Sequence, residues 1–188
     1  MLGLAPAFAS DTISIEFGEV DTENQVVEIL YDNPGQIYGF KFFVLGIDIT
    51  DAYGGDAEAY NFFLNQNSTC WRDDDCKDEV EGFTYTGTPI PPGSGTLLYI
   101  TYAEIGDEIF DENIQVGDQT CLDITEGYFF GMGSDGEFGD FIIETGPCAD
   151  SPIDCNGDYY GSSNVDDCGV CDGGNVDMDC AGICNGDA

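Results

Sequence analysis

The chain has 188 residues, 42% of them hydrophobic, so it is long enough to bury the core of one ordinary domain and to carry an appendage. Three basic residues stand against 38 acidic ones, giving a formal net charge of -35 at pH 7. Charge of this sign and density disfavours nucleic acid and anionic membrane surfaces as partners, and it favours bound cations. The alternative is an acidic protein that is merely soluble, as in salty habitats, but its aspartates are spaced rather than scattered. No stretch approaches the length of a membrane span, so we expect no membrane insertion.

Residues 1–10 precede the first strand-like pattern. Residues 2–10 read LGLAPAFAS, in which Ala7-Phe8-Ala9 is a small-x-small cleavage pattern. We interpret this segment as the remnant of a secretory signal or, alternatively, as an ordinary disordered terminus. The first interpretation predicts an extracellular protein, secreted or at the cell surface.

From Asp11 onward the pattern is that of β-strands. Short runs rich in aromatic and β-branched residues are bounded by Gly, Pro, Asn or Asp, which is typical of strands joined by turns. These runs are residues 12–17, 24–33, 36–50, 81–87, 95–103, 120–130 and 137–145. Residues 56–64 are the one helix candidate. The sequence therefore predicts an all-β, antiparallel, jelly-roll-like sandwich of seven to nine strands over residues 11–148.

Three stretches of this region resemble the cohesin family of extracellular proteins. They read VVEILYDNPGQIYGFKFFVLGIDIT from Val26, GFTYTGTPIPPGSGTLLYITYAEIG from Gly82, and TCLDITEGYFFG from Thr120. The resemblance covers about residues 12–147 and implies a β-sandwich whose sheet face contacts a protein partner, although the dockerin-binding residues of cohesins have no identifiable counterparts here. The insert at residues 65–81 departs from a plain cohesin.

That insert contains Cys70 and Cys76, which flank the sequence WRDDD and can close a small ring at a loop tip. Trp71, the only tryptophan, is a candidate contact for a sugar or protein partner. We favour the alternative, in which the insert folds back and Trp71 caps the sandwich. Asn67 begins a glycosylation sequon in an expected surface loop, a short and common motif whose use depends on the organism.

Nine cysteines and no histidine favour disulfides over zinc. Cys121 lies in an expected strand and Cys148 follows the last one, so a bond between them would hold the root of the C-terminal segment against the domain. Such a bridge contributes about 2–4 kcal/mol. The remaining five cysteines, whose pairing the sequence leaves open, are Cys155, Cys168, Cys171, Cys180 and Cys184.

Residues 149–188 form a tail rich in Asp, Gly and Cys that cannot bury a core. Asp154-Cys155-Asn156-Gly157 is followed 25 residues later by Asp179-Cys180-Ala181-Gly182, so we interpret the tail as one repeat and an incomplete second one. The odd number of cysteines then predicts a partner cysteine beyond residue 188.

The aspartates of this tail are spaced like ligands of calcium, which takes 6–8 oxygen ligands. We expect calcium as the cofactor, and its candidate ligands are Asp154, Asn156, Asp158, Asp166, Asp167, Asp172, Asp177 and Asp179. Tyr159 and Val165 stand where an EF-hand has Gly and Glu, which excludes that loop. The tail instead resembles the Asp- and Cys-rich type 3 repeats of thrombospondins. An acidic, disulfide-linked stalk without metal is the alternative.

The sequence favours a non-enzymatic function. Without histidine, Ser-His-Asp and Cys-His nucleophiles are excluded within this chain, and nothing places two carboxylates in a cleft. We expect a structural or adhesive module that contacts a protein partner or self-associates, including into a homopolymer. The alternative is a carbohydrate-binding module that recognises a polysaccharide. A candidate sugar platform on one sheet face comprises Tyr38, Tyr53, Tyr60, Tyr99 and Tyr102, which could equally be packing residues.

Overall fold

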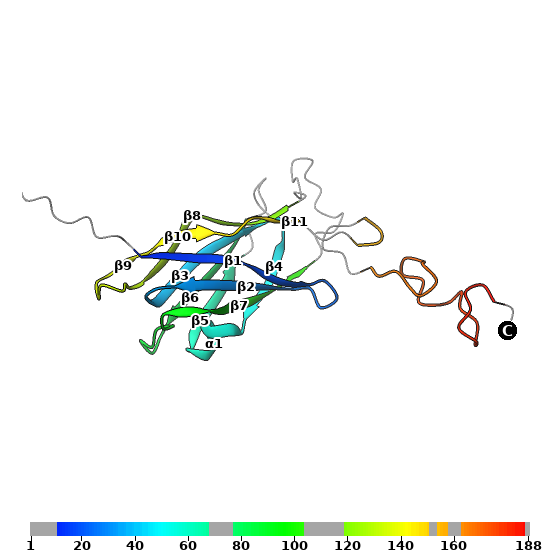
Figure 1. Ribbon diagram of the computed structural model, residues 1–188, viewed down its shortest axis with the longest axis horizontal. Coiled ribbons are helices and arrows are strands. Elements are labelled where there is room, and N and C mark those ends of the chain that lie inside the picture. Colours follow the sequence, from blue (N-terminus) through cyan, green and yellow to red (C-terminus); the bar gives the residue numbers. More distant parts are fainter. Residues whose placement is uncertain (1–10, 68–76, 104–118, 151–153, 158–162, 187–188) are drawn as a thin grey trace, which may run out of the picture.

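The computed structural model describes residues 11–67, 77–103, 119–150, 154–157 and 163–186. Its described strands form two sheets that pack face to face (Figure 1). Sheet A has the strand order β10-β1-β2-β7-β4, and sheet B has the order β11-β8-β3-β6-β5, with β9 paired to β8. The elements are β1 (Thr12–Asp21), β2 (Val26–Asn33), β3 (Gln36–Leu45), β4 (Asp48–Tyr53), α1 (Gly55–Ala59), β5 (Phe62–Asn67), β6 (Lys77–Thr84), β7 (Gly93–Ala103), β8 (Gln119–Met132), β9 (Phe138–Asp140), β10 (Ile142–Thr145) and β11 (Ala149–Asp150). The predicted all-β sandwich is confirmed.

The core lies between the two sheets because apolar residues alternate along the strands. Sheet A contributes aliphatic side chains such as Ile13, Ile29 and Ile100, all fully buried. Sheet B contributes aromatic ones, and the Phe40 ring stacks on those of Phe42, Phe62 and Phe129 at centroid distances of 6.1, 5.8 and 5.6 Å. Offset rings at these distances add to the stabilisation that burial alone gives.

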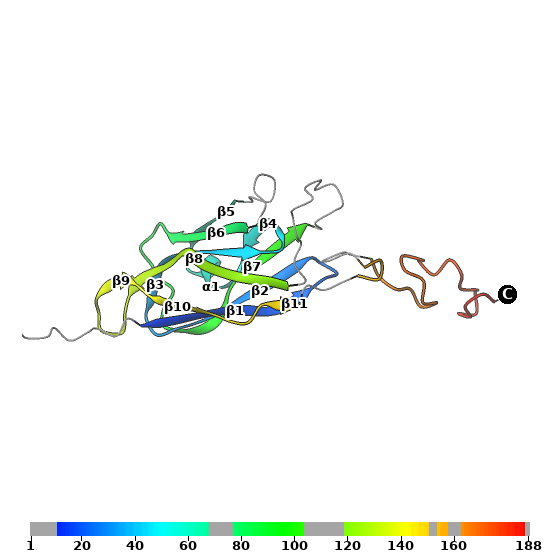
Figure 2. The same ribbon diagram turned by 90° about the horizontal axis from the view of Figure 1, so that it is seen from above.

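One strand pairing differs from the antiparallel pattern. β10 pairs with β1 in parallel, from Thr12 opposite Ile142 to Ile15 opposite Thr145. The chain reaches this position by crossing from β9 in sheet B to β10 in sheet A (Figure 2). Phe141, at the crossing, is buried and anchors it. The parallel ladder thus places the last strand of sheet A beside the first.

The prediction of a helix over residues 56–64 is wrong for the second half of this segment. α1 covers only Gly55–Ala59, and the chain then passes through Asn61, whose φ of 58° ends the helix. From Phe62 the residues alternate, with Phe62 in the core and Phe63 exposed. Burial of Phe62 against the Phe40 ring therefore outweighs the helical preference of this segment.

Two buried polar side chains organise turns that sequence patterns alone do not reveal. The Asn33 carboxamide accepts a hydrogen bond from the Gly35 amide (2.8 Å) and donates to the Pro91 carbonyl (3.1 Å), which fixes the turn between β2 and β3. The carboxylate of Asp78, fully buried on β6, accepts from the Ile49 amide on β4 at 2.5 Å. These bonds satisfy backbone groups that burial would otherwise leave without partners.

The sheet continues as far as β11, which pairs with Gln119 and Thr120 at the start of β8. Cys121 and Cys148 are joined by a disulfide, the pairing expected from the sequence, so the start of β8 and the chain that enters the tail are covalently linked. Among the described residues, no helix is long and apolar enough to cross a membrane.

Candidate functional site

The outer face of sheet B carries a row of aromatic residues at one end. Phe63 of β5 lies opposite Phe83 of β6, which lies opposite Gly39 of β3, and Gly39 lies opposite Phe130 of β8. Cross-strand partners project from the same face of a sheet, so this register brings the three phenylalanines together on one face. Gly39, which lies between Phe83 and Phe130 in this register, has no side chain.

Six rings on this side of the sandwich form two clusters, and we call them together the aromatic patch. The first cluster has three mutual ring contacts at 5.0–5.7 Å, and the second is centred on Phe138, whose ring lies 5.2 and 6.0 Å from its two neighbours. The patch comprises Phe63, Phe83 and Tyr85 in one cluster and Tyr38, Phe130 and Phe138 in the other. Four of the six are 41–73% exposed, which is unusual for large apolar side chains gathered in one place.

Next to the patch, the same face holds both lysines of the chain. Lys41 forms an ion pair with Glu79 at 2.7 Å and Lys77 with Asp123 at 2.8 Å. Both ammonium groups also lie over the Phe43 ring, at 5.1 and 4.1 Å from its centroid. Such cation–π contacts stabilise by about 0.5–2 kcal/mol. The two lysines therefore neutralise acidic side chains on a face that would otherwise repel itself.

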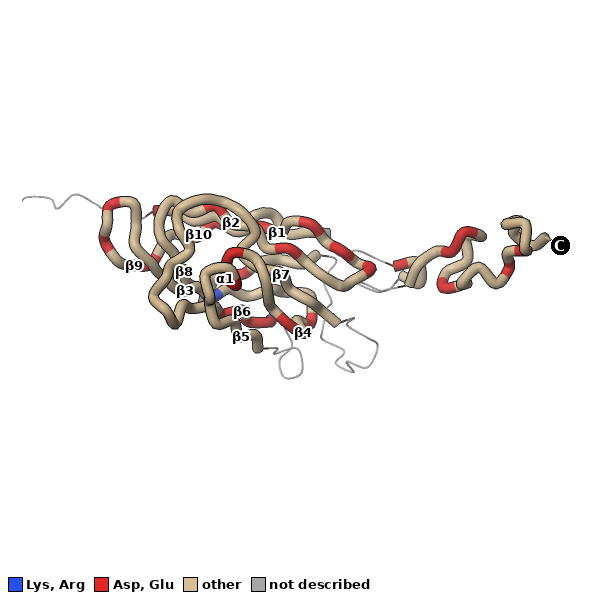
Figure 3. The backbone as a smooth tube through the Cα atoms, turned by 90° about the horizontal axis from the view of Figure 1, so that it is seen from below, with Lys and Arg blue, Asp and Glu red and all other residues tan. Residues whose placement is uncertain are grey.

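Hydrogen bonds fix the acidic side chains around these lysines. The Tyr128 hydroxyl donates to Glu81 at 2.7 Å, and burial together with this bond raises the pKa of Tyr128 to about 12. The hydrogen bond to Glu79 raises the pKa of Lys41. Figure 3 shows acidic positions spread over much of the described chain and basic ones confined to the sandwich. Within the described residues, the outer face of sheet B is thus where positive charge is concentrated.

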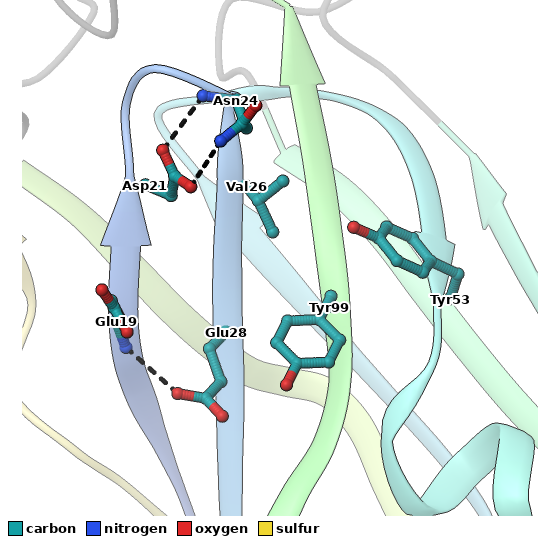
Figure 4. A pocket seen from close by; sticks show the side chains of 7 residues that line it. All are labelled: Glu19, Asp21, Asn24, Val26, Glu28, Tyr53 and Tyr99. Atoms are coloured by element: carbon teal, nitrogen blue, oxygen red, sulfur yellow. Dashed lines mark hydrogen bonds between the residues drawn. The ribbon is translucent and has the colours of Figure 1, made fainter.

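The outer face of sheet A is different, because it is acidic and hollowed. A hollow of about 420 Å³ is lined by Glu19, Asp21, Asn24, Val26, Glu28, Tyr53 and Tyr99 (Figure 4). Asp21 accepts two hydrogen bonds from Asn24, through its amide at 3.0 Å and its side chain at 2.8 Å, and the side-chain bond is the main cause of the lowered pKa of Asp21. Glu28 accepts from the Thr96 hydroxyl at 2.5 Å and from the Glu19 amide at 3.3 Å.

The five tyrosines proposed as one sugar platform do not share a face. Tyr53 and Tyr99 lie together in the hollow of sheet A, with ring centroids 5.9 Å apart. Tyr38 belongs to the aromatic patch on sheet B, and Tyr102 is buried between the sheets. The prediction failed because strand order, which the sequence does not show, decides which alternating positions become neighbours.

The tail is built from a recurring turn of the form Asp-x-x-Gly. In each turn the glycine amide donates to the aspartate carbonyl at 2.9–3.1 Å, and the aspartate carboxylate accepts from the amide two residues later at 2.8–2.9 Å. The glycines have φ of 78–95°, a region that side chains disfavour. The turns begin at Asp154, Asp166 and Asp179, so the 25-residue period spans two structural units rather than one.

Overlapping disulfides link these turns. Cys155 pairs with Cys171 and Cys168 pairs with Cys184, each across 16 residues. Cys180 is exposed and has no disulfide partner among the described residues, so its expected pairing with a cysteine beyond residue 188 stays a prediction. Cys180 stands in its turn where Cys155 stands in the first. The described part of the tail is therefore a ladder of two overlapping disulfide-closed rings.

The predicted calcium ligands have other partners in this structure. Ser163 is the meeting point of three of them: its amide donates to Asp154 at 3.2 Å, its hydroxyl donates to Asp172 at 2.7 Å, and the Asn156 side chain donates to that hydroxyl at 2.8 Å. Around the second turn, Asn175 bridges Asp166 and Asp167, with bonds of 3.0 Å to each carboxylate.

The carboxylates of Asp166 and Asp179 also accept from Val170 and Ile183 in their own turns. The backbone bond from Val170 is the main cause of the lowered pKa of Asp166. Within the described residues, no three Asp, Glu or Cys side chains gather as a metal centre. The aspartates of the tail thus have a role in holding turns, in addition to any role as ligands.

Several predicted features lie outside the described residues. They are the signal-like segment 1–10, Cys70, Trp71, Cys76 and Asp158. Asn67 is described and is exposed at the end of β5, opposite Glu79. The sequon asparagine is therefore accessible.

No protein-family model matches the chain, and no curated protein is significantly similar to it in sequence. Solved structures of cohesin modules are similar to it in fold. A non-cellulosomal cohesin from Archaeoglobus fulgidus is 12% identical, with a TM-score of 0.43 over 71% of this chain and 86% of that chain. CaCohA2 from Clostridium acetobutylicum is 14% identical, with a TM-score of 0.44 over 74% and 89%. The second type II cohesin module of ScaA from Acetivibrio cellulolyticus is 8% identical, with a TM-score of 0.39 over 78% and 93%. The likeness concerns the fold alone.

Proposed function

We propose that this chain is a non-enzymatic extracellular module that contacts another protein through the aromatic patch on sheet B. The observation that carries the proposal is the patch itself: two clusters of largely exposed rings on the outer face of sheet B. Protein interfaces are enriched in aromatic residues and depleted in charged ones at their centre. Leaving these rings in water is unfavourable, and a partner that covers them removes that cost.

Electrostatics supports a partner different from this chain. Two copies would each bring a formal charge of -35, and their mutual repulsion opposes a homopolymer at physiological salt. Lys41 and Lys77 neutralise the face beside the patch, which lowers the electrostatic cost of approach there. Self-association through the patch is therefore the weaker proposal, and it requires cations to screen the two acidic surfaces.

The tail supports an extracellular and structural role. Its two described disulfides form only under oxidising conditions, and together they close overlapping rings in a segment without a hydrophobic core. We propose that calcium further stabilises the tail by binding where Asp154, Asn156 and Asp172 meet at Ser163, since each carboxylate has more acceptor sites than the observed bonds use. The tail then acts as a stiffened stalk that carries the sandwich.

Site-specific photo-cross-linking tests the protein contact. A benzophenone side chain at Tyr85 places the reactive group in the patch, and the same group at the exposed Glu144 of β10 serves as the matched site on the other sheet. In the native extracellular medium we expect one dominant protein adduct from position 85 and none of that species from position 144. Combined Phe63→Ala and Phe130→Ala changes should lower the adduct yield by about tenfold or more, since each removes an exposed apolar contact.

Equal adduct yields from positions 85 and 144 would show that the patch is not the contact face. Binding to immobilised polysaccharide that is lost in the Phe63→Ala, Phe130→Ala variant would instead favour the carbohydrate-binding alternative. A dominant adduct between two copies of this chain would favour the homopolymer. The three outcomes are distinguished by the mass of the adduct and by the glycan assay.

A further inference from the structure

Part of the hollow on sheet A is a row of side chains that crosses three strands. Glu28 of β2 lies opposite Tyr99 of β7, and Tyr99 lies opposite Tyr53 of β4, so the three project from the same face. Figure 4 shows the Tyr99 ring between the Glu28 carboxylate and the Tyr53 ring. The floor of the hollow is therefore aromatic and one side of it is acidic.

Backbone features hold this row in place. Between Phe17 and Val20 the pairing of β1 with β2 shifts register, and this irregularity turns the Glu19 amide towards Glu28, to which it donates at 3.3 Å. Beside β7, Gly54 has φ of 72°, and a Cβ there would lie 2.9 Å from the Tyr99 ring. The positive φ and the close approach to Tyr99 both favour glycine here, because a side chain at this position would meet the ring.

The polar groups of the hollow are almost all acceptors. Glu19, Asp21 and Glu28 contribute carboxylate oxygens, which accept hydrogen bonds, and the side-chain donors of the lining are the Asn24 amide and the two phenols. One Asn24 donor is already used by Asp21. A suitable ligand must therefore supply many donors and few acceptors. A saccharide fits poorly, because each hydroxyl brings two acceptor sites for its one donor.

We propose that this hollow binds the guanidinium group of an arginine side chain on a partner protein. A guanidinium has five donors and no acceptor, is permanently charged, and is planar, so that it stacks on tyrosine while it donates to a carboxylate. The hollow offers a partner for each interaction: the Tyr53–Tyr99 pair for stacking and the adjacent Glu28 carboxylate for hydrogen bonds. Cation–π attraction and the acidic surroundings act in the same direction.

The proposal assigns the arginine to a partner protein, and neither basic residue that the structure describes is an arginine. Lys41 and Lys77 are held in ion pairs on the opposite sheet. This proposal does not depend on the aromatic patch, since the hollow lies on the outer face of sheet A and the patch on that of sheet B. An experiment that refutes one of these two proposals therefore leaves the other unaffected.

An NMR titration of the full 188-residue chain tests the proposal at physiological salt. The probe is the peptide acetyl-Gly-Arg-Gly-amide, and its matched control carries citrulline, which is neutral and of nearly the same shape. We expect saturable shifts at the amides of Val26, Glu28, Tyr53 and Tyr99 with the arginine peptide. The citrulline peptide should bind at least about tenfold more weakly, because charge-assisted hydrogen bonds are roughly twice as strong as neutral ones.

Paired variants separate a specific site from attraction to an acidic protein. Glu28→Gln should weaken binding about tenfold, whereas Glu137→Gln, which removes the same charge from the exposed β8–β9 turn, should leave it unchanged. Tyr53→Leu should weaken it about threefold through loss of the cation–π contact. Equal effects of the two glutamate changes, equal binding of citrulline, or tighter binding of a neutral oligosaccharide at the same amides would overturn the proposal.

Discussion

Replacing Lys77 with methionine tests whether the lysines stabilise the face beside the aromatic patch. Methionine keeps an apolar stem over Phe43 but removes the ammonium group, which lies 2.8 Å from Asp123 and 4.1 Å from the ring centroid. Burial opposes ionisation of Asp123, but the hydrogen bond from Lys77 and two from Thr125 together lower its pKa from 3.8 to about 2. Removing Lys77 takes away part of that stabilisation.

The magnitude follows from these contacts. Without solvent screening, a pKa shift of this size would stabilise the folded state by about 2.5 kcal/mol. Thr125 supplies part of it, and the Asp123 side chain is 20% exposed, so solvent screening leaves about 1 kcal/mol for the ion pair with Lys77. Loss of the cation–π contact adds about 0.5–1 kcal/mol. We therefore expect Lys77→Met to lower the free energy of unfolding by about 1.5–2 kcal/mol at pH 7.

The pH dependence gives the sharper test. The pKa of Asp123 is lower in the folded state than in the unfolded state, so its ionised carboxylate stabilises the fold above pH 3.8. This contribution to the free energy of unfolding is lost as the pH falls towards 2. Urea unfolding followed by circular dichroism should thus show a constant difference between wild type and Lys77→Met from pH 7 to about pH 4.5, and a smaller one at pH 2.5. A difference below about 0.3 kcal/mol at pH 7, or one that does not shrink at pH 2.5, would refute the reasoning. Lys41→Met, whose ammonium lies farther from the ring, is expected to cost less.

Two further predictions concern the tail. Native-state alkylation followed by peptide mapping should label Cys180 and leave Cys155, Cys168, Cys171 and Cys184 protected until reduction; labelling of any of these four in the unreduced protein would contradict the disulfide ladder. Calcium at millimolar concentration should slow amide hydrogen exchange around Ser163 relative to chelator, and Asp172→Asn, which keeps one acceptor oxygen but no charge, should weaken the effect about tenfold or more. Identical exchange with calcium and with chelator would leave the aspartates with their turn-forming role alone.

The strand pattern of the sandwich was readable from sequence because burial enforces alternation. Runs such as residues 12–17 and 95–103 became β1 and β7, with alternate residues in the core. The run at residues 36–50 proved to be two strands, and Gly46, with φ of 91°, lies in the turn that separates them. The strand β5 was missed because Phe62 and Phe63 read equally well as part of a helix, and only contact with Phe40 resolves them.

In the tail, the sequence determined the turns and the tertiary arrangement determined the pairing. Asp at the start of a turn and Gly three residues later are local requirements, since the carboxylate caps nearby amides and the glycine takes a positive φ. Which cysteines pair is not local. The structure shows that the two tail disulfides have the same 16-residue separation, which no local pattern around each cysteine reveals.

What the sequence by itself determined is the class of the fold: a β-sandwich followed by an aspartate- and cysteine-rich tail. Alternation, turn residues and cysteine count are local properties, and each constrains the chain within a few residues. Only the tertiary structure decided the two candidate surfaces. The order of strands placed Phe63 beside Phe83 and near Phe130 on one sheet, and Glu28 beside Tyr99 and Tyr53 on the other. These residues are far apart along the chain, so they form a common surface only when the strands pair.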